Sequence, residues 1–186
     1  GIEAELEERL AELERQGIAD NTLVVFSSDN GGERYASNVP LFHHKATLWE
    51  GGIRVPCLMR WPAKLPKGKV SPQAGITMDL TATFLAAAGE PDIKAKLLKG
   101  HKAGKKTYKV HLDGFNMLPY LKGEVKDSPR NSFFYISDDG DILAIRMQDW
   151  KVVLMEQRAK QLQCWAEPFV KLRIPKMFHL RRDPFE

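Results

Sequence analysis

The sequence predicts an α/β fold that carries a small antiparallel β subdomain at its C-terminal end. A helix-like amphipathic segment at residues 2–16 leads through a short turn into a strand at residues 22–28 with an uninterrupted apolar run at 23–26. Further apolar segments of strand and helix type follow up to residue 121. From residue 132 onward, short β-rich segments separated by turn sequences take over. This change of pattern indicates a mixed sheet with flanking helices, followed by a second and smaller sheet.

The first part of the chain contains the elements expected for the larger sheet and its helices. Apolar residues recur every three or four positions in segment 2–16, which predicts a helix with one apolar face that ends at Gly17. The run at residues 23–26 does not alternate with polar residues, so we expect a central strand covered on both faces. The other elements expected here are a long loop at residues 33–49, a strand at 53–61 interrupted by Pro56, a helix at 78–88 and a short helix at 115–121.

The final third of the chain has the pattern of β-hairpins. We expect strands at residues 132–137, 142–147 and 150–155, with a fourth candidate at 177–181. The intervening acids Asp138, Asp139 and Asp141 resemble part of a calcium-binding loop. The spacing and the closing glutamate of such a loop are absent, so this segment is interpreted as a hairpin turn.

The composition is that of a globular chain, with 186 residues, 43% hydrophobic residues and a net charge of +4. No apolar run approaches the about 18 residues that a membrane-spanning helix requires. No signal peptide is visible, because the first residues form an acidic amphipathic helix pattern. The two cysteines, Cys57 and Cys164, are too few for a disulfide framework and lack the spacing of metal ligands, so their state stays open.

Seven lysines and one histidine lie between residues 94 and 109, in a segment with little aromatic content. We interpret this segment as a lysine-rich, solvated loop. The alternative is a surface that attracts nucleic acid or a sulfated polymer. No recognisable nucleic-acid-binding motif accompanies the lysines, so no nucleic-acid partner is expected.

The strand at residues 22–28 runs directly into Asp29 and Asn30, which precede a glycine pair. A carboxylate and a carboxamide oxygen at the end of a buried strand suit a hard cation such as Ca²⁺ or Mg²⁺. The same residues are also typical of a simple turn. Because a calcium ion takes about six or more oxygen ligands, any metal site here needs further ligands from elsewhere.

Lys45 is a candidate for binding an anion in the long loop that follows. A lysine provides a compact positive charge suited to sulfate or phosphate, although most loop lysines are merely solvated. His43 and His44 precede it. Adjacent residues of a regular element cannot both point at one site, so at most one histidine is expected to act there. A surface position is the alternative for each histidine.

The block that begins at Glu50 combines two glycines with two charged residues. Gly51 and Gly52 permit a close approach of backbone segments, and we expect Glu50 and Arg54 to brace this loop. The sequence lacks a Gly-x-Ser-x-Gly nucleophile elbow, and the context of neither cysteine suggests a catalytic partner. The sequence therefore offers candidate residues for an anion and a metal ion, and no recognisable nucleophile accompanies them.

An ordered series of motifs carries a resemblance to a known family. The series comprises residues 21–32, Asn38-Val39-Pro40-Leu41, Lys45, residues 49–56, Arg60-Trp61-Pro62, Met78-Asp79-Leu80, Ser128-Pro129-Arg130-Asn131, Phe134-Tyr135, Trp150-Lys151 and residues 180–185. With these motifs the chain resembles the sulfatase family, specifically the C-terminal portion of arylsulfatase-type enzymes in the alkaline phosphatase superfamily. The family fold is a large α/β domain with a mixed sheet plus a small domain with a four-stranded antiparallel sheet, which agrees with the pattern above.

The resemblance implies roles for individual residues. Asp29 and Asn30 look like two ligands of a calcium ion, for which Mg²⁺ is an alternative. Lys45 looks like the catalytic lysine that binds the sulfate oxygens. His44, in a segment 42–44 that departs from the family pattern, is our own candidate for substrate binding beside it. The implied activity is calcium-dependent hydrolysis of a sulfate ester, on a small molecule or a sulfated sugar.

The resemblance also implies that the chain is one part of a longer enzyme. Sulfatases use a formylglycine made from the first residue of a Cys/Ser-x-Pro/Ala-x-Arg motif in their N-terminal half, and neither Cys57 nor Cys164 lies in such a motif. The missing half is thus the expected partner, and the chain alone is expected to be inactive. Residues 1–125 are assigned to the large domain and residues 126–186 to a truncated small subdomain. A periplasmic or secreted location is compatible with the family, but the location stays open.

Two other functions remain as alternatives. One is a phosphonate monoester or phosphodiester hydrolase of the same superfamily, whose metal-bearing strand ends look much alike. The other is a non-catalytic module that binds an anionic polysaccharide through the lysine-rich segment.

Overall fold

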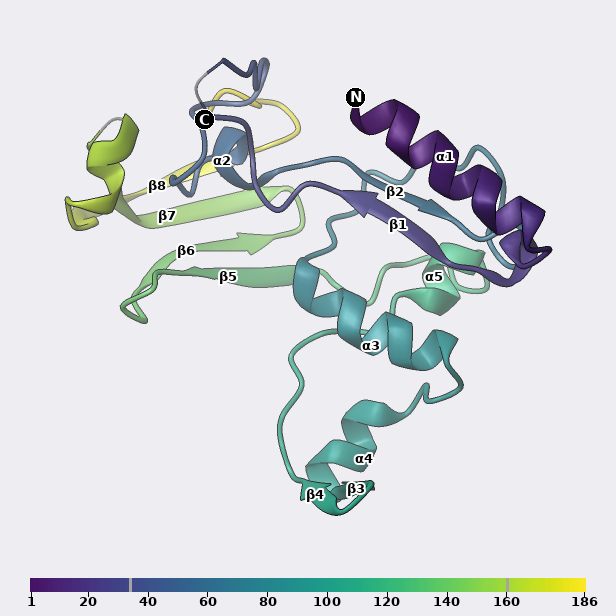
Figure 1. The fold of residues 1–186 in the computed structure, drawn as a ribbon. Coiled ribbons are helices and arrows are strands. Elements are labelled where there is room, and N and C mark those ends of the chain that lie inside the picture. The colour runs from purple at the N-terminus through teal and green to yellow at the C-terminus, as the bar shows by residue number, and fades with distance from the viewer. Residues whose placement is uncertain (34, 160) are drawn as a thin grey trace. The chain divides into compact units, whose positions relative to one another are not determined.

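The computed structural model describes residues 1–33, 35–159 and 161–186, and the chain divides into two compact units. Unit 1 contains Gly1–Val24 and Arg60–Arg130, and unit 2 contains Val25–Met59 and Asn131–Glu186 (Figure 1). Cys57 and Cys164 are free thiols. Among the described residues, every helix is too short or too polar to cross a bilayer. The domain division at residues 125 and 126 concerns the longer protein and stays a prediction.

Unit 1 is mainly helical, and two of its helices confirm the sequence prediction closely. The helices α1 and α3 match the segments expected at residues 2–16 and 78–88, whereas α5 begins three residues later than expected. The elements of this unit are α1 (Ile2–Arg15), η1 (Ala19–Asn21), α3 (Thr77–Ala87), α4 (Ile93–Lys99), β3 (His101–Ala103), β4 (Lys106–Tyr108) and α5 (Leu118–Lys122).

The segment at residues 94–109 is a helix followed by a β-hairpin, so the prediction of a loop is wrong. Ile93 is buried and Leu97, one turn later, is half-buried, so α4 has an apolar face despite its lysines. The helix ends at Gly100, and Gly104, with a φ of +60°, lies in the hairpin turn. The expectation of solvation was correct, because most side chains of the segment are exposed.

Unit 2 contains the four-stranded antiparallel sheet that the sequence predicts. Its strands are β5 (Ser132–Ile136), β6 (Ile142–Met147), β7 (Trp150–Glu156) and β8 (Val170–His179), in the order β5-β6-β7-β8. Figure 1 shows them side by side. The fourth strand begins at Val170, earlier than the candidate segment at 177–181.

One face of this sheet forms the core of unit 2. The register pairs Arg146 of β6 with Phe133 of β5 and with Lys151 of β7. Because side chains alternate along a strand, Tyr135, Ala144 and Val153 lie on the same face two residues away. The face packs against Leu48 and Trp49 of the loop, which are 3% and 5% exposed. Two long cationic side chains therefore start from an apolar face that the loop covers.

The strand β1 (Val24–Ser27) pairs with β2 (Cys57–Arg60) in a two-stranded sheet. The expectation that β1 is covered on both faces is wrong for this chain, since Phe26 is 36% exposed. β2 is its partner among the described residues, so the rest of its surface has little to pack against. The strand expected at residues 53–61 begins only after Pro56, because the short helix α2 (Glu50–Ile53) ends at Ile53 and irregular backbone follows up to the proline.

Candidate functional site

The turn that follows β1 holds Asp29 and Asn30 in a defined conformation. The Oδ1 atom of Asp29 accepts the backbone N–H of Asn30 at 3.0 Å, and the Ser28 hydroxyl donates to the Asn30 carbonyl oxygen at 2.9 Å. Asp29 is exposed and Asn30 is half-buried. The interpretation as a turn and the interpretation as metal ligands are therefore compatible. One carboxylate oxygen of Asp29 orders the turn, and the other has no protein partner among the described residues.

The glycine pair after this turn lies against the glycine pair of α2. The Gly31 N–H donates to the Gly52 carbonyl oxygen at 2.8 Å. A Cβ atom on Gly31 would lie 1.9 Å from the Gly51 carbonyl oxygen, and one on Gly51 would lie 2.4 Å from the His43 carbonyl oxygen. Three backbone segments therefore approach closely at positions where only glycine fits. This confirms the reason inferred from the sequence for the glycines.

Asn38 connects the glycine turn to the loop that carries the histidines. Its Oδ1 accepts the Gly32 N–H at 2.9 Å, and its Nδ2 donates to the carbonyl oxygens of Gly32 at 2.9 Å and His43 at 3.1 Å. The Lys45 N–H also donates to the Gly32 carbonyl oxygen, at 3.1 Å. The backbone of Lys45 is thereby fixed two residues away from Asn30 along the turn, so the fold brings the predicted lysine and the predicted metal ligands onto adjoining turns.

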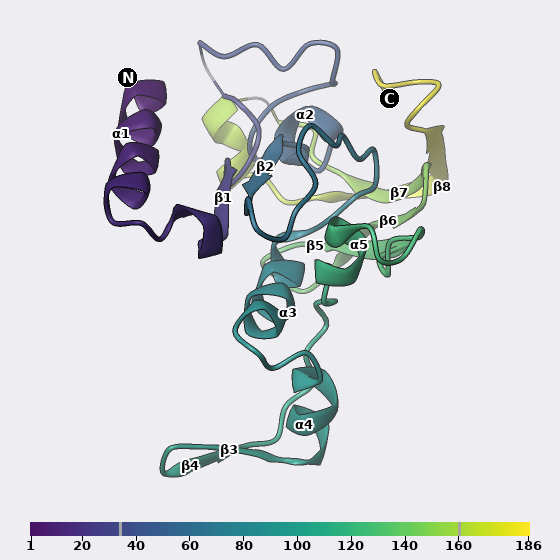
Figure 2. The same ribbon diagram turned by 90° about the vertical axis from the view of Figure 1, so that its right-hand side faces the viewer.

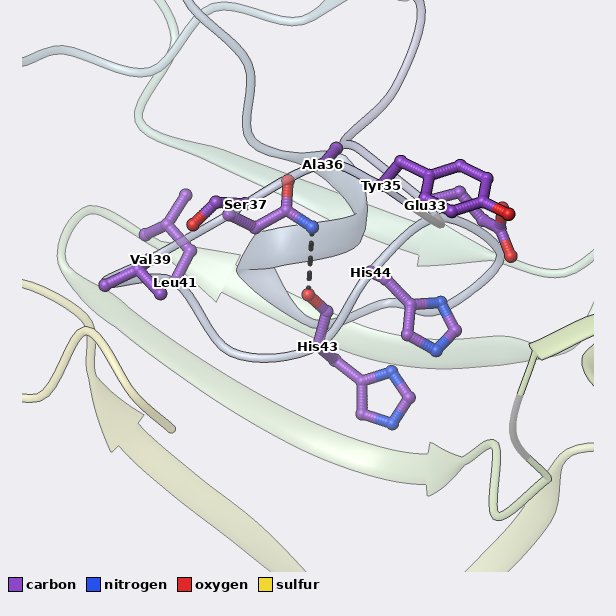
Figure 3. Close-up of a pocket in the computed structure, with 9 residues that line it drawn as sticks. Glu33, Tyr35, Ala36, Ser37, Val39, Leu41, His43 and His44 are labelled. Atoms are coloured by element: carbon purple, nitrogen blue, oxygen red, sulfur yellow. Dashed lines mark hydrogen bonds between the residues drawn. The ribbon is translucent and has the colours of Figure 1, made fainter.

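His43 and His44 lie closer together than a regular element allows. His43 has a φ of +69°, and the two ring centroids are 4.4 Å apart with the planes tilted by 44°. Figure 3 shows both rings on the same side of the loop. The left-handed backbone at His43 removes the alternation of a regular element, so both rings lie on one side, and the expectation that at most one of them acts stays a prediction. The Nδ1–H of His44 donates to the Lys45 carbonyl oxygen at 2.7 Å.

The loop forms a pocket of about 440 Å³. Its walls are Glu33, Tyr35, Ala36, Ser37, Asn38, Val39, Leu41, His43 and His44 (Figure 3). Asp29, Asn30 and Lys45 are not part of its walls, so these three candidate residues lie outside the pocket. His44 is the predicted site residue that faces the pocket, with Nε2 as the ring nitrogen not bonded to the Lys45 carbonyl.

The oxygen donors of the turn suit a hard cation but do not surround one. Asp29 and Asn30 offer a carboxylate and a carboxamide oxygen, which is the donor type that Ca²⁺ prefers. Within the described ranges, no group of three or more histidine, cysteine, aspartate or glutamate side chains is placed to hold a metal ion. The oxygen ligands of the turn therefore fit calcium, but they are only part of the ligand shell that a calcium ion requires. The Lys45 ammonium has no ion-pair partner in these ranges.

Glu50 braces the loop, as expected, but its partners come from the sheet rather than from Arg54. Glu50 is 1% exposed, whereas Arg54 is exposed. Arg146 Nη1 donates to Glu50 Oε2 at 3.3 Å, and the Tyr135 hydroxyl donates to Glu50 Oε1 at 3.4 Å. Burial, followed by the nearby Glu50 carboxylate, raises the pKa of Tyr135, so its phenol stays protonated and acts as the donor.

Lys151 links the same glutamate to a second buried carboxylate. Its Nζ lies 2.6 Å from Glu186 Oε1 and 3.6 Å from Glu50 Oε1, and it donates to the Leu48 carbonyl oxygen at 2.7 Å. Glu186 Oε2 accepts the Glu50 N–H at 2.6 Å. Burial lowers the pKa of Lys151, and the Glu186 and Glu50 carboxylates oppose that shift. Both acids are thus partnered although they are withdrawn from water.

We name Glu50, Arg146, Lys151 and Glu186 the buried charge cluster. It joins the sheet to residues 48–50, and α2, which begins at Glu50, presents the glycines that contact Gly31. The cluster therefore fixes the platform on which the Asp29-Asn30 turn rests. Sequence reasoning missed Arg146, Lys151 and Glu186 because their contacts with Glu50 span 96, 101 and 136 positions in sequence. Only the Trp150-Lys151 motif pointed to one of them.

Comparison with known proteins identifies sulfatases throughout. Residues 4–90 match the family described as Sulfatase. Human N-acetylgalactosamine-6-sulfatase is 37% identical over 202 residues, which cover 91% of this chain and 33% of that protein. Human arylsulfatase A is 30% identical over 186 residues, again with 91% of this chain and 33% of that protein. The chain thus spans about a third of the length of these relatives.

The fold of the chain also matches a solved structure. The PsFucS1 sulfatase from Pseudoalteromonas sp. superposes with a TM-score of 0.78 at 25% identity, over 96% of this chain and 34% of that one. Both the helical unit and the antiparallel sheet therefore have counterparts in that protein.

Proposed function

The chain belongs to the sulfatase family, and from this premise we propose that it forms the calcium- and sulfate-binding part of an arylsulfatase-type hydrolase. The observation that carries the proposal is the hydrogen bond of the Lys45 N–H to the Gly32 carbonyl oxygen. It holds a cationic residue beside the turn that bears Asp29 and Asn30. An anionic ester needs both kinds of group, because charge on its oxygens must be neutralised while the bond to the leaving group breaks.

Each of the candidate residues has a distinct task in this proposal. Asp29 and Asn30 bind the calcium ion, which supplies Lewis-acid stabilisation of the sulfate oxygens when it is bound. The Lys45 ammonium holds one sulfate oxygen and offsets the charge that develops on the leaving group. His44, with Nδ1 bonded to the Lys45 carbonyl oxygen, directs Nε2 toward a polar group of the substrate.

The nucleophile of the proposed enzyme lies outside this chain. We propose a formylglycine in the remaining part of the protein, which also supplies the other calcium ligands. The 186-residue chain alone is then expected to bind calcium weakly and to leave sulfate esters intact, because a hard cation needs a nearly complete oxygen shell.

Comparison of two esters by the full-length protein tests the reaction class. We expect an aryl sulfate to be hydrolysed faster than a phosphodiester with the same leaving group, in terms of kcat/KM. Lys45→Ala should reduce the rate for the aryl sulfate by about 100-fold or more, as expected for the loss of a charge that stabilises the transition state. Faster turnover of the phosphodiester would overturn the proposal in favour of a phosphodiester hydrolase of the same superfamily.

The substrate proposed is a sulfate ester on an aromatic ring or on a sugar. The similarity to arylsulfatase A supports the first class, and the similarity to N-acetylgalactosamine-6-sulfatase supports the second. The pocket of about 440 Å³ beside His44 has room for one ring, so either class can be accommodated at this position.

A further inference from the structure

Positive charge is concentrated in one segment of unit 1, residues 93–110, which we name the basic arm. It contains seven lysines and no acidic residue, for a formal charge of +7. The whole chain carries only +4, so the residues outside the arm have a net charge of −3. The arm is therefore a positive surface on an otherwise slightly negative chain, and such asymmetry attracts polyanions.

The basic arm has a defined structure that begins at α4 and continues through the hairpin β3-β4. Ile93 is 5% exposed, the Lys94 ammonium lies 4.3 Å from the centroid of the Phe115 ring, and the Val110 N–H donates to the Leu97 carbonyl oxygen at 3.2 Å. Figures 1 and 2 show the hairpin at the end of α4 remote from α3. Because α4 packs into unit 1 and Val110 is bonded back to α4, the backbone of the hairpin is fixed, and binding a ligand costs less conformational entropy than ordering a loop.

Two of the seven lysines are engaged within unit 1. Lys94 lies over Phe115, and Lys96 pairs with Glu90. The remaining five are exposed and make no ion pair or ring contact with any residue in the described ranges. They are Lys99, Lys102, Lys105, Lys106 and Lys109. Because these cations have no ion-pair or ring partner within the described ranges, they are available to an anionic ligand.

The hairpin register spreads these cations around its tip. Lys106 pairs with Ala103 and Lys102 pairs with Thr107, so the two lysines lie on opposite faces of the hairpin. Lys105 lies in the turn next to Gly104. A single exposed contact between a lysine and an anion contributes little in water. A polymer that crosses the tip meets several cations at once, and their effects combine.

We propose that the basic arm binds a sulfated polysaccharide. The choice of sulfate over other anionic groups rests on the proposed function, because a sulfatase acting on a polymer must hold one. Lysine, a compact point charge, provides all the cations of the arm, and arginine, which reads guanine in pairs of hydrogen bonds, is absent from it. One aromatic residue, Tyr108, is too few for a platform that stacks nucleic-acid bases.

Binding of heparin oligosaccharide to the full-length protein tests this proposal. We expect the triple variant Lys102→Ala, Lys105→Ala, Lys106→Ala to bind about tenfold more weakly at low salt, and the slope of log K against log salt to fall by about two. The matched control Lys67→Ala, Lys126→Ala, Lys171→Ala removes the same charge from exposed sites outside the arm and should keep nearly wild-type binding. Equal losses in the two triple variants would overturn the proposal.

Competing polymers and turnover separate this proposal from the one on which it rests. Unsulfated hyaluronan and a single-stranded RNA should compete with heparin at least tenfold less well, and equal competition by either would show a general polyanion surface instead. Hydrolysis of a small aryl sulfate should be the same in the wild type and in both triple variants. Absence of that hydrolysis in the wild type would contradict the proposed function, whereas unselective polymer binding would contradict only the role of the arm.

Discussion

Each unit of the chain has buried charges in its core, but the two sets are built differently. In unit 1, both oxygens of Asp79 are saturated, with Arg130 donating at 2.6 and 2.7 Å and the N–H groups of Phe115 and Ile76 donating at 2.8 and 3.0 Å. In unit 2, the buried charge cluster shares two acids between two bases, and its contacts with the Glu50 carboxylate are 3.3 to 3.6 Å long. The Asp79-Arg130 pair is thus fully hydrogen-bonded at short distances, whereas the buried charge cluster holds the Glu50 carboxylate through longer contacts.

The Asp79-Arg130 pair and the buried charge cluster connect different parts of the chain, which indicates different roles. Asp79 joins the first turn of α3 to Phe115, before α5, and to Arg130, after α5, so the pair stabilises the helices of unit 1. The buried charge cluster joins the sheet of unit 2 to the loop that supports the Asp29-Asn30 turn. We infer that damage to the pair affects folding alone, whereas damage to the cluster affects both folding and the candidate site.

Removal of Arg130 should give the largest loss of stability. Arg130→Met leaves the Asp79 carboxylate buried without its cation, and we expect the full-length protein to lose about 4 kcal/mol in urea unfolding. Calcium affinity per folded molecule should stay at the wild-type value. A loss of affinity with the fold intact would remove the distinction between the two sets of charges.

Removal of Lys151 should reduce stability somewhat less than removal of Arg130, and it should also weaken calcium binding at the candidate site. Lys151→Met takes away the main cation beside Glu186, while Arg146 still faces Glu50, so we expect a loss of about 3 kcal/mol. Calcium affinity, measured by titration of the folded full-length protein, should fall because residues 48–50 are released from the sheet. Wild-type affinity in this variant would show that the cluster does not position the turn.

A methyl group on Gly31 should disturb the site directly. Gly31→Ala places a Cβ 1.9 Å from the Gly51 carbonyl oxygen, and overpacking of this kind costs about 1 to 3 kcal/mol. We expect weaker calcium binding and slower aryl sulfate hydrolysis in the full-length protein. Gly75→Ala is the matched control, because nothing lies within 4 Å of its added Cβ, and it should behave as the wild type.

The smallest effect is expected at Asn38. Asn38→Ala removes three hydrogen bonds to the backbone of Gly32 and His43, in a half-buried position, at a cost of about 1 to 2 kcal/mol. Because Asn38 bonds to Gly32 and His43 and not to Asp29 or Asn30, KM for the aryl sulfate should rise while calcium affinity changes little. A fall in calcium affinity as large as that caused by Gly31→Ala would show that Asn38 positions the Asp29-Asn30 turn as well.

Local patterns in the sequence were sufficient for most of the fold. The spacing of apolar residues identified α1 and α3, and the turn at Asp138-Asp139-Gly140-Asp141 identified the β5-β6 hairpin. The lysine-rich segment was identified, but its helix and hairpin were missed because the two apolar anchors, Ile93 and Leu97, are outnumbered by lysines. Coverage of β1 could not be judged from its apolar run alone, since burial depends on what packs against the strand.

In the candidate site, too, the residues that local sequence patterns identify were predicted, and the contacts between distant residues were not. Asp29, Asn30 and Lys45 follow from residue type and order, and the glycine pairs follow from their need for space. The orientation of His43 and His44 depends on a single left-handed residue, which the sequence does not reveal. The buried charge cluster depends on the strand register, which puts Arg146 beside Lys151 across the sheet.

Calcium titration of the full-length protein with and without Asp29 tests the central claim most directly. We expect Asp29→Ala to abolish calcium binding at concentrations that saturate the wild type, and to abolish aryl sulfate hydrolysis with it. Asp138→Ala, which removes an acid from the β5-β6 turn, should change neither. Wild-type calcium affinity and activity in Asp29→Ala, or full activity of the wild type in excess chelator, would contradict the assignment of this turn to the metal.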